Sequence, residues 1–73
     1  MIRLKIRDLR EDKDWTQQCI ADLLFINRRT YAAYENGINQ PPLDMLVKIA
    51  NLHNTSVDYL LGITDEIKAY PRK

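Results

Sequence analysis

The stretch Thr16–Gly37, TQQCIADLLFINRRTYAAYENG, decides the fold. Apolar or small residues recur in it at helical spacing in two short groups, first Ile20, Ala21 and Leu24, then Tyr31 and Tyr34. Helices of about eight residues are marginal in water by themselves. We therefore expect both helices to pack on each other and on the rest of the chain.

Polar and glycine residues punctuate the ends of these two helices. Thr16 and Asn27 are good N-caps, because their side-chain oxygens can accept an amide proton from the opening turn. Gly37 is suited to end the second helix, since glycine readily adopts the left-handed conformation found there. Two capped helices separated by a few residues cross at a steep angle, which predicts helix-turn-helix geometry.

An ordered set of residues carries a family resemblance. The set is Thr16-Gln17, Ala21, Leu24, Ile26, Asn27-Arg28, Tyr34-Glu35-Asn36-Gly37, Leu43, Leu46, Ile49-Ala50 and Ser56-Val57-Asp58-Tyr59-Leu60-Leu61-Gly62. It resembles the Cro and phage-repressor type of helix-turn-helix domain, the XRE family, without gaps over roughly residues 2–62. The resemblance implies an all-α, five-helix, lambda-repressor-like DNA-binding domain at 1–62. Its third helix, at 28–36, would enter the major groove.

Composition agrees with one small helical domain. Seventy-three residues are near the lower limit for unaided folding, and a hydrophobic share of 45% excludes a disordered tail. Two glycines and three prolines favour helices over turn-rich sheet. The single Cys19 cannot form an internal disulfide, and the longest apolar run, 23–26, is too short for a membrane span. We expect a cytoplasmic protein without a signal peptide or membrane partner.

The charge pattern is informative only locally. Eleven Lys and Arg against ten Asp and Glu give a net charge of +1, which does not by itself indicate a nucleic-acid partner. However, Arg28 and Arg29 are adjacent at a predicted helix start, where backbone amides add positive potential. Five of the ten acidic residues fall in the first third, namely Asp8, Glu11, Asp12, Asp14 and Asp22. We expect a polarised domain.

Three further helices are predicted outside the central pair. Ile2, Ile6 and Leu9 share one face of a first helix ending near Asp12; the alternation at 2–6 also fits a strand, but no second strand pattern exists to pair with it. Trp15 is expected to cover the core. A fourth helix after Pro41-Pro42 carries an apolar stripe of Leu43, Leu46, Ile49, Ala50 and His53. A fifth, Val57–Leu61, is bounded by Ser56 and Gly62, and Asn54 can end the fourth.

Several residues are candidates for DNA contact. They are Thr16, Gln17, Asn27, Arg28, Arg29, Ala32, Ala33, Asn36 and Gln40. Arg28 is expected to bind guanine O6 and N7, Arg29 to bind a phosphate or a second base, and the two alanines to pack on thymine methyls. Gln17 is expected on a phosphate, and the loop after Gly37 along the backbone. The alternative is that these polar side chains are simply solvated.

Three residues have expected structural roles. In the family, a basic residue at the position of Arg10 pairs with a glutamate at the position of Glu35. The resemblance therefore implies a structural ion pair between Arg10 and Glu35. The alternative is that Arg10 is a solvated surface arginine. Phe25 stands where the family has glycine or asparagine at positive φ, so either strain is tolerated or the turn relaxes. His53 replaces an apolar residue, and we expect a hydrogen-bonded, partly buried imidazole rather than a ligand.

The residue types present in the chain limit the classes of function that it can have. One His, one Cys, no phosphate-binding glycine loop and no paired carboxylates argue against an enzyme, a metal site or a cofactor. A DNA-binding transcriptional regulator, most simply a repressor acting as a homodimer on a double-stranded operator, is the leading hypothesis, with no small-molecule ligand evident. The alternative is an antitoxin or protein-partner module on the same scaffold, with Leu23, Phe25 or the tail as anchors. Residues 63–73 are either a frayed tail or a dimer contact.

Overall fold

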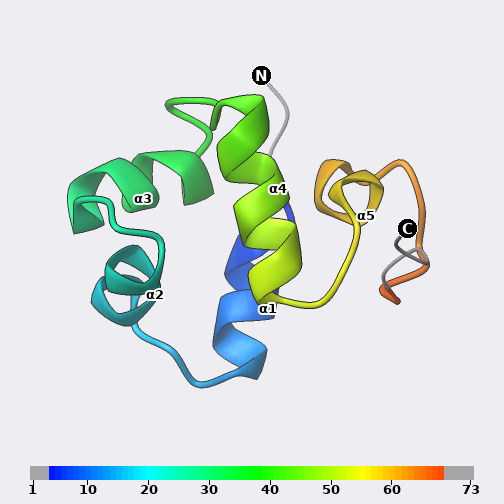
Figure 1. Ribbon diagram of the computed structural model, residues 1–73, viewed down its shortest axis with the longest axis horizontal. Coiled ribbons are helices and arrows are strands. Elements are labelled where there is room, and N and C mark those ends of the chain that lie inside the picture. Colours follow the sequence, from blue (N-terminus) through cyan, green and yellow to red (C-terminus); the bar gives the residue numbers. More distant parts are fainter. Residues whose placement is uncertain (1–3, 69–73) are drawn as a thin grey trace.

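The computed structural model describes residues 4–68, which form five helices and no strand. The helices are α1 (Ile6–Asp12), α2 (Gln17–Leu23), α3 (Arg28–Glu35), α4 (Leu43–Leu52) and α5 (Val57–Leu61). In Figure 1, α2 and α3 lie on one side of the central α4 and α5 lies on the other. The expected all-α, five-helix fold is confirmed.

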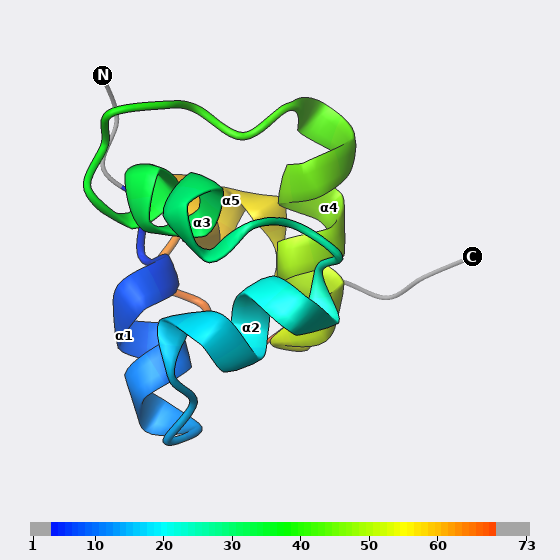
Figure 2. The same ribbon diagram turned by 90° about the vertical axis from the view of Figure 1, so that its left-hand side faces the viewer.

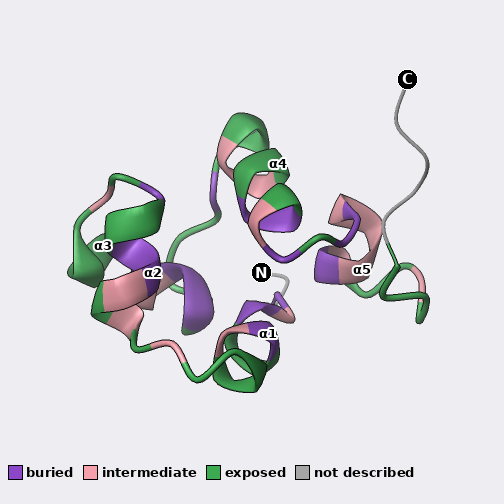
Figure 3. Cartoon of the chain, turned by 60° about the horizontal axis from the view of Figure 1, so that its bottom comes forward, coloured by how far each residue is buried: buried purple, intermediate pink, exposed green. Residues whose placement is uncertain are grey.

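A single core holds these short helices together. Each helix contributes at least one side chain with no exposed surface, namely Ile6, Ile20, Tyr31, Ile49 and Leu60. The buried parts of the helices face one another, and the exposed parts face outward (Figure 3). Since helices this short are marginal alone, tertiary burial supplies most of their stability.

Side-chain caps set the helix boundaries where the sequence predicts them. The Thr16 hydroxyl accepts a hydrogen bond from the Cys19 amide at 3.0 Å, and the Asn27 side-chain oxygen accepts one from the Arg29 amide at 2.7 Å. Ser56 caps α5 in the same way, through the Tyr59 amide at 3.1 Å. Gly37 and Gly62 have φ of +75° and +78°, the left-handed values expected after α3 and α5.

Two predicted features of the outer helices differ from the structure. The first helix begins at Ile6; Leu4 is buried but not helical, and the Lys5 amide donates to the Leu60 carbonyl at 3.1 Å instead. Ile2 lies outside the described residues. Leu43, predicted to belong to the apolar stripe of α4, is 73% exposed. The helix starts beyond the edge of the core, and Leu46 is the first residue of that stripe that packs against the core.

The environment of His53 corrects one expectation. Its side chain is buried, but neither ring nitrogen has a hydrogen-bond partner among the described residues, so the hydrogen-bonded imidazole was a wrong prediction. The ring instead packs on Trp15, at 5.6 Å between centroids. Burial lowers the pKa of His53, and the nearby Lys13 charge lowers it further. Trp15 lies half-buried against the core, as expected of a covering residue.

The segment after α5 runs back along the domain without forming a helix as far as residue 68. The Thr55 hydroxyl donates to the Ile67 carbonyl, and the Ile63 amide donates to the Asp58 carbonyl at 2.9 Å. Ile63 and Ile67 are 70% and 47% exposed. Tyr70 and Pro71-Arg72-Lys73 of the tail lie outside the described residues.

Candidate nucleic-acid interface

One face of α3 is anchored in the core and the opposite face is open. Tyr31 and Tyr34 are buried, whereas Arg28 and Arg29 are exposed in the first turn. The Asn27 side chain accepts from the Arg29 amide at 2.7 Å, and the first turn of a helix carries further amides that lack acceptors within the helix. This end of α3 therefore combines positive side chains with the positive end of the helix dipole.

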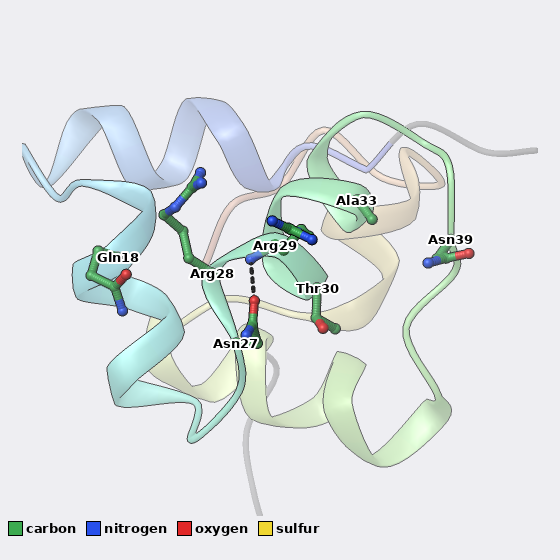
Figure 4. Close-up of a pocket in the computed structure, with 7 residues that line it drawn as sticks. All are labelled: Gln18, Asn27, Arg28, Arg29, Thr30, Ala33 and Asn39. Atoms are coloured by element: carbon green, nitrogen blue, oxygen red, sulfur yellow. Dashed lines mark hydrogen bonds between the residues drawn. The ribbon is translucent and has the colours of Figure 1, made fainter.

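The exposed face of α3 borders an open hollow of about 870 Å³. Figure 2 shows α2 and α3 together on the face toward the viewer, with the loop after α3 passing above them. The hollow is lined from α2, α3 and that loop by Gln18, Asn27, Arg28, Arg29, Thr30, Ala33 and Asn39 (Figure 4). Amides, guanidinium groups and methyls are the groups that bind base edges and phosphates.

The hollow gathers some of the predicted residues and not others. Asn27, Arg28, Arg29 and Ala33 line it. Ala32, expected to be exposed with Ala33, is outside the lining, and both alanines are half-buried because they lie between the two buried tyrosines. The other candidates lie elsewhere on the surface: Thr16 and Gln17 at the start of α2, Asn36 on the side of α1, and Gln40 exposed in the loop.

Thr30 and Gln18 line the hollow but were not among the residues expected to contact DNA, and Asn39 was expected there only as part of the loop along the DNA backbone. Thr30 comes three residues before Ala33, so helical spacing alone places both on one face. No comparable signal exists for Gln18, and for Asn39 the sequence indicates the loop but not the individual residue. They reach the hollow only because α2 and the loop fold against α3.

Gln17 links the exposed arginine to the interior. Its amide nitrogen donates to Glu35 Oε1 at 3.2 Å, and its amide oxygen accepts from Arg28 Nη1 at 3.4 Å. The carboxamide is half-buried, so its orientation is fixed from within the domain. A second N–H of the Gln17 amide is left for an external acceptor such as a phosphate.

Behind Gln17 lies an ion pair that joins α1 to the end of α3. Arg10 Nε is 2.6 Å from Glu35 Oε2, Arg10 Nη2 is 3.3 Å from Glu35 Oε1, and Nη1 donates to the Trp15 carbonyl at 2.8 Å. Only 14% of the Arg10 side chain and 3% of the Glu35 side chain are exposed. Burial alone would raise the pKa of Glu35, but hydrogen bonds from Arg10 and Gln17 outweigh it and hold that pKa below its usual value.

Phe25 occupies the turn between α2 and α3 in a left-handed conformation. Its φ is +58°, and 92% of the residue is exposed. The turn therefore tolerates the strain rather than relaxing, at a cost of about 1–2 kcal/mol. The angle between α2 and α3 is set by the core beneath them and not by this side chain.

Residues 4–68 hold neither a cluster of metal-ligating side chains nor a helix suited to a membrane. The structure there has no group of three or more His, Cys, Asp or Glu side chains placed to hold a metal ion. Within the same residues, no helix combines the length and apolar character required to cross a membrane.

Comparisons with known proteins bear on the face built from α2 and α3. The model of the helix-turn-helix family matches residues 6–60 of the chain. HTH-type transcriptional regulator AnsR of Bacillus subtilis is 40% identical over 68 residues, which are 93% of this chain and 59% of that protein. No solved structure gives a significant match.

Two further relatives are similar over most of the chain. The uncharacterised HTH-type transcriptional regulator YobD of Bacillus subtilis is 40% identical over 85% of the chain and 55% of its own length. The cryptic phage CTXphi transcriptional repressor RstR of Vibrio cholerae is 34% identical over 85% of the chain and 56% of its own length. The chain thus spans a little more than half the length of these relatives.

Proposed function

The chain belongs to the helix-turn-helix family, and on this premise we propose that it is a sequence-specific DNA-binding transcriptional regulator, more narrowly a repressor, that acts by binding alone. Relatives named transcriptional regulators, one of them a phage repressor, support this proposal. The observation that carries it is the pair of exposed arginines at the capped start of α3, beside a polar hollow.

In the proposed complex, α3 lies in the major groove with Arg28 nearest the base edges. A guanidinium forms two parallel hydrogen bonds with guanine, worth about 1–3 kcal/mol of discrimination. Arg29 binds a phosphate or a second base, and the methyls of Thr30 and Ala33 contact thymine. The neutral amides of Gln17, Asn36 and Gln40 bind phosphates and fix the register without reading sequence.

We further infer that two copies bind one operator. A symmetric dimer presents two reading helices about 34 Å apart, which matches one turn of DNA. Ile63 and Ile67 are exposed apolar side chains on the segment after α5 and are candidates for that contact. We place the protein in the cytoplasm, where its double-stranded DNA partner would be.

The test is selection from a random duplex library at fixed moderate salt. The wild-type protein is compared with the double variant Arg28→Ala, Arg29→Ala. Both side chains are exposed, and the long 3.4 Å hydrogen bond from Arg28 to Gln17 adds little stability, so the double variant is expected to fold normally, which its thermal unfolding checks. The proposal expects an enriched two-fold symmetric motif that the double variant loses.

Single variants then separate base reading from phosphate binding. Arg28→Ala should cost about 1–3 kcal/mol on the selected site and relax one base position. Gln17→Ala should weaken all sites nearly equally. No enrichment with wild-type protein would overturn the DNA-binding proposal and transfer the function to the alternative, an antitoxin or protein-partner module.

A further inference from the structure

The geometry points to a second binding surface, on which the turn between α2 and α3 receives an amphipathic helix of another protein that carries apolar side chains and a carboxylate. This surface, which we name the turn patch, is formed by Leu23, Leu24, Phe25, Lys48, Asn51 and Leu52. It shares no residue with the hollow beside α3. The inference goes beyond the proposed function and does not require it.

The turn patch is a hollow with an aromatic ring at its rim. Its volume is about 380 Å³, and its walls come from the end of α2, the turn and the second half of α4. Leu23 is 46% exposed and Phe25 92%, whereas Leu24 is 3% exposed and closes the floor. Apolar side chains gathered in one concave place are the usual feature of a docking site, unlike apolar residues scattered singly.

Phe25 is a separate observation that favours a binding role for the turn patch. The residue is left-handed, and in the free domain almost none of its ring is buried. The left-handed conformation of Phe25 therefore destabilises the fold, and its exposed ring adds little packing to offset this. An outlier of this kind favours a role in recognition, and aromatic rings are enriched at the centres of interfaces.

The chemistry of the lining identifies the occupant. Lys48 is the one ionisable residue that lines the hollow, and it is exposed without an ion pair among residues 4–68. An apolar floor with a cation at its edge complements an apolar segment that carries an acidic residue. The walls are helices and offer no strand edge, which argues against strand addition and favours a helix laid in the groove through its side chains.

The position of the turn patch allows binding alongside DNA. In Figure 2 the link between α2 and α3 lies at the edge of the face that carries these helices, next to α4. Arg28 and Arg29 line the other hollow. A partner helix on the turn patch would thus reach a protein whose α3 is already occupied.

Selection from a displayed library of helical peptides, randomised on one face, tests this inference on the full chain. Wild-type protein should enrich peptides with two apolar residues one turn apart and an adjacent Asp or Glu. Phe25→Gly should weaken a selected synthetic peptide about tenfold or more, as expected for the loss of an anchor residue. Glycine accepts positive φ, so this variant keeps the turn, and its thermal unfolding confirms that it folds.

A charge exchange makes the test specific. Lys48→Glu should weaken the acidic peptide, and replacing the acidic residue of the peptide by Lys should restore binding to that variant only. Leu43→Ala, an exposed apolar residue outside the turn patch, is the matched control and should change nothing. No enrichment, equal binding by Phe25→Gly, or indifference to the charge exchange would overturn the inference. So would self-association of the protein that Phe25→Gly abolishes, because the occupant would then be a second copy.

Discussion

Glu35 takes part in three side-chain hydrogen bonds, as many as its partner Arg10. Its carboxylate accepts hydrogen bonds from Arg10 and Gln17, while the pKa of its neighbour Tyr31 is raised, chiefly by burial. A buried carboxylate is costly without a cation, and Arg10 supplies it. Through Gln17 the same carboxylate restrains Arg28 at the proposed DNA face. One residue thus connects the ion pair of the core to an exposed arginine of the proposed DNA face.

We predict that removing either partner of this ion pair destabilises the domain by about 3 kcal/mol at neutral pH. Arg10→Met leaves the buried carboxylate of Glu35 without a cation, and Glu35→Leu leaves the buried cation of Arg10 without a carboxylate. The combined variant Arg10→Met, Glu35→Leu should recover most of the loss, because two apolar side chains replace both charges. Denaturant unfolding of all three variants measures the coupling; purely additive losses would contradict a direct interaction.

The pH dependence of this pair follows from the lowered pKa of Glu35. The stabilisation is fully present above the pKa that Glu35 has in the unfolded chain, about 4.3, and is lost as the pH falls through the lower pKa of the folded state. Wild-type protein should therefore lose stability below about pH 4. Glu35→Gln removes this titration. The difference in melting temperature between wild type and variant should therefore become smaller when thermal unfolding is followed from pH 7 to pH 3.

His53 leads to a second pH effect at higher pH. Burial and Lys13 lower its pKa, so the folded domain prefers the neutral ring. Stability is then complete above the unfolded pKa of about 6.5 and falls as the pH drops toward the folded pKa. His53→Leu should abolish this slope and raise stability by about 1 kcal/mol, since it removes two buried nitrogens without partners. A slope between pH 7.5 and 5.5 that survives in the variant would contradict this assignment.

At the scale of helices, local chemistry determines boundaries that the sequence predicts well. Thr16, Asn27 and Ser56 cap α2, α3 and α5 through bonds within three residues, so neither the core nor the partner helices need be known. Leu43 and the start of α1 were misplaced because they depend on where the core ends. Helical periodicity predicts which face of a helix is apolar, but not how far along the helix that face packs on the core.

Asn27 tests the contribution of one such cap. Asn27→Ala should lower the free energy of unfolding by about 1 kcal/mol, because the Arg29 amide loses its acceptor. Asn27→Ser should keep most of the wild-type stability, because a serine hydroxyl can accept the same hydrogen bond. Thr30→Ala, an exposed change one turn further along α3, is the matched control and should have little effect. Thermal unfolding of the three variants gives the comparison. Equal stability of the Ala and Ser variants would show that solvent replaces this cap.

At the scale of the molecule, the proposed DNA interface depends on three segments that meet only after folding. Arg28 and Arg29 could be selected from sequence because they follow a cap at a predicted helix start. Gln18 could not, and Asn39 was expected only as part of a loop, since their place in the hollow depends on how α2 and the loop pack against α3. The turn patch is similar: Phe25 was recognisable as unusual, but Lys48 joins it only through the position of α4.

The overall charge leads to the last prediction, which concerns the salt dependence of DNA binding. With a net charge of +1 and mostly neutral amides around α3, cationic contacts are expected only from Arg28 and Arg29. Each phosphate charge neutralised contributes about −0.9 to the slope of log K against log salt, so four arginines in a dimer limit it to about −4. Arg29→Ala should make the slope shallower by up to about 2. A wild-type slope steeper than about −6 would mean that further basic residues bind the backbone and that α3 is not the main electrostatic contact.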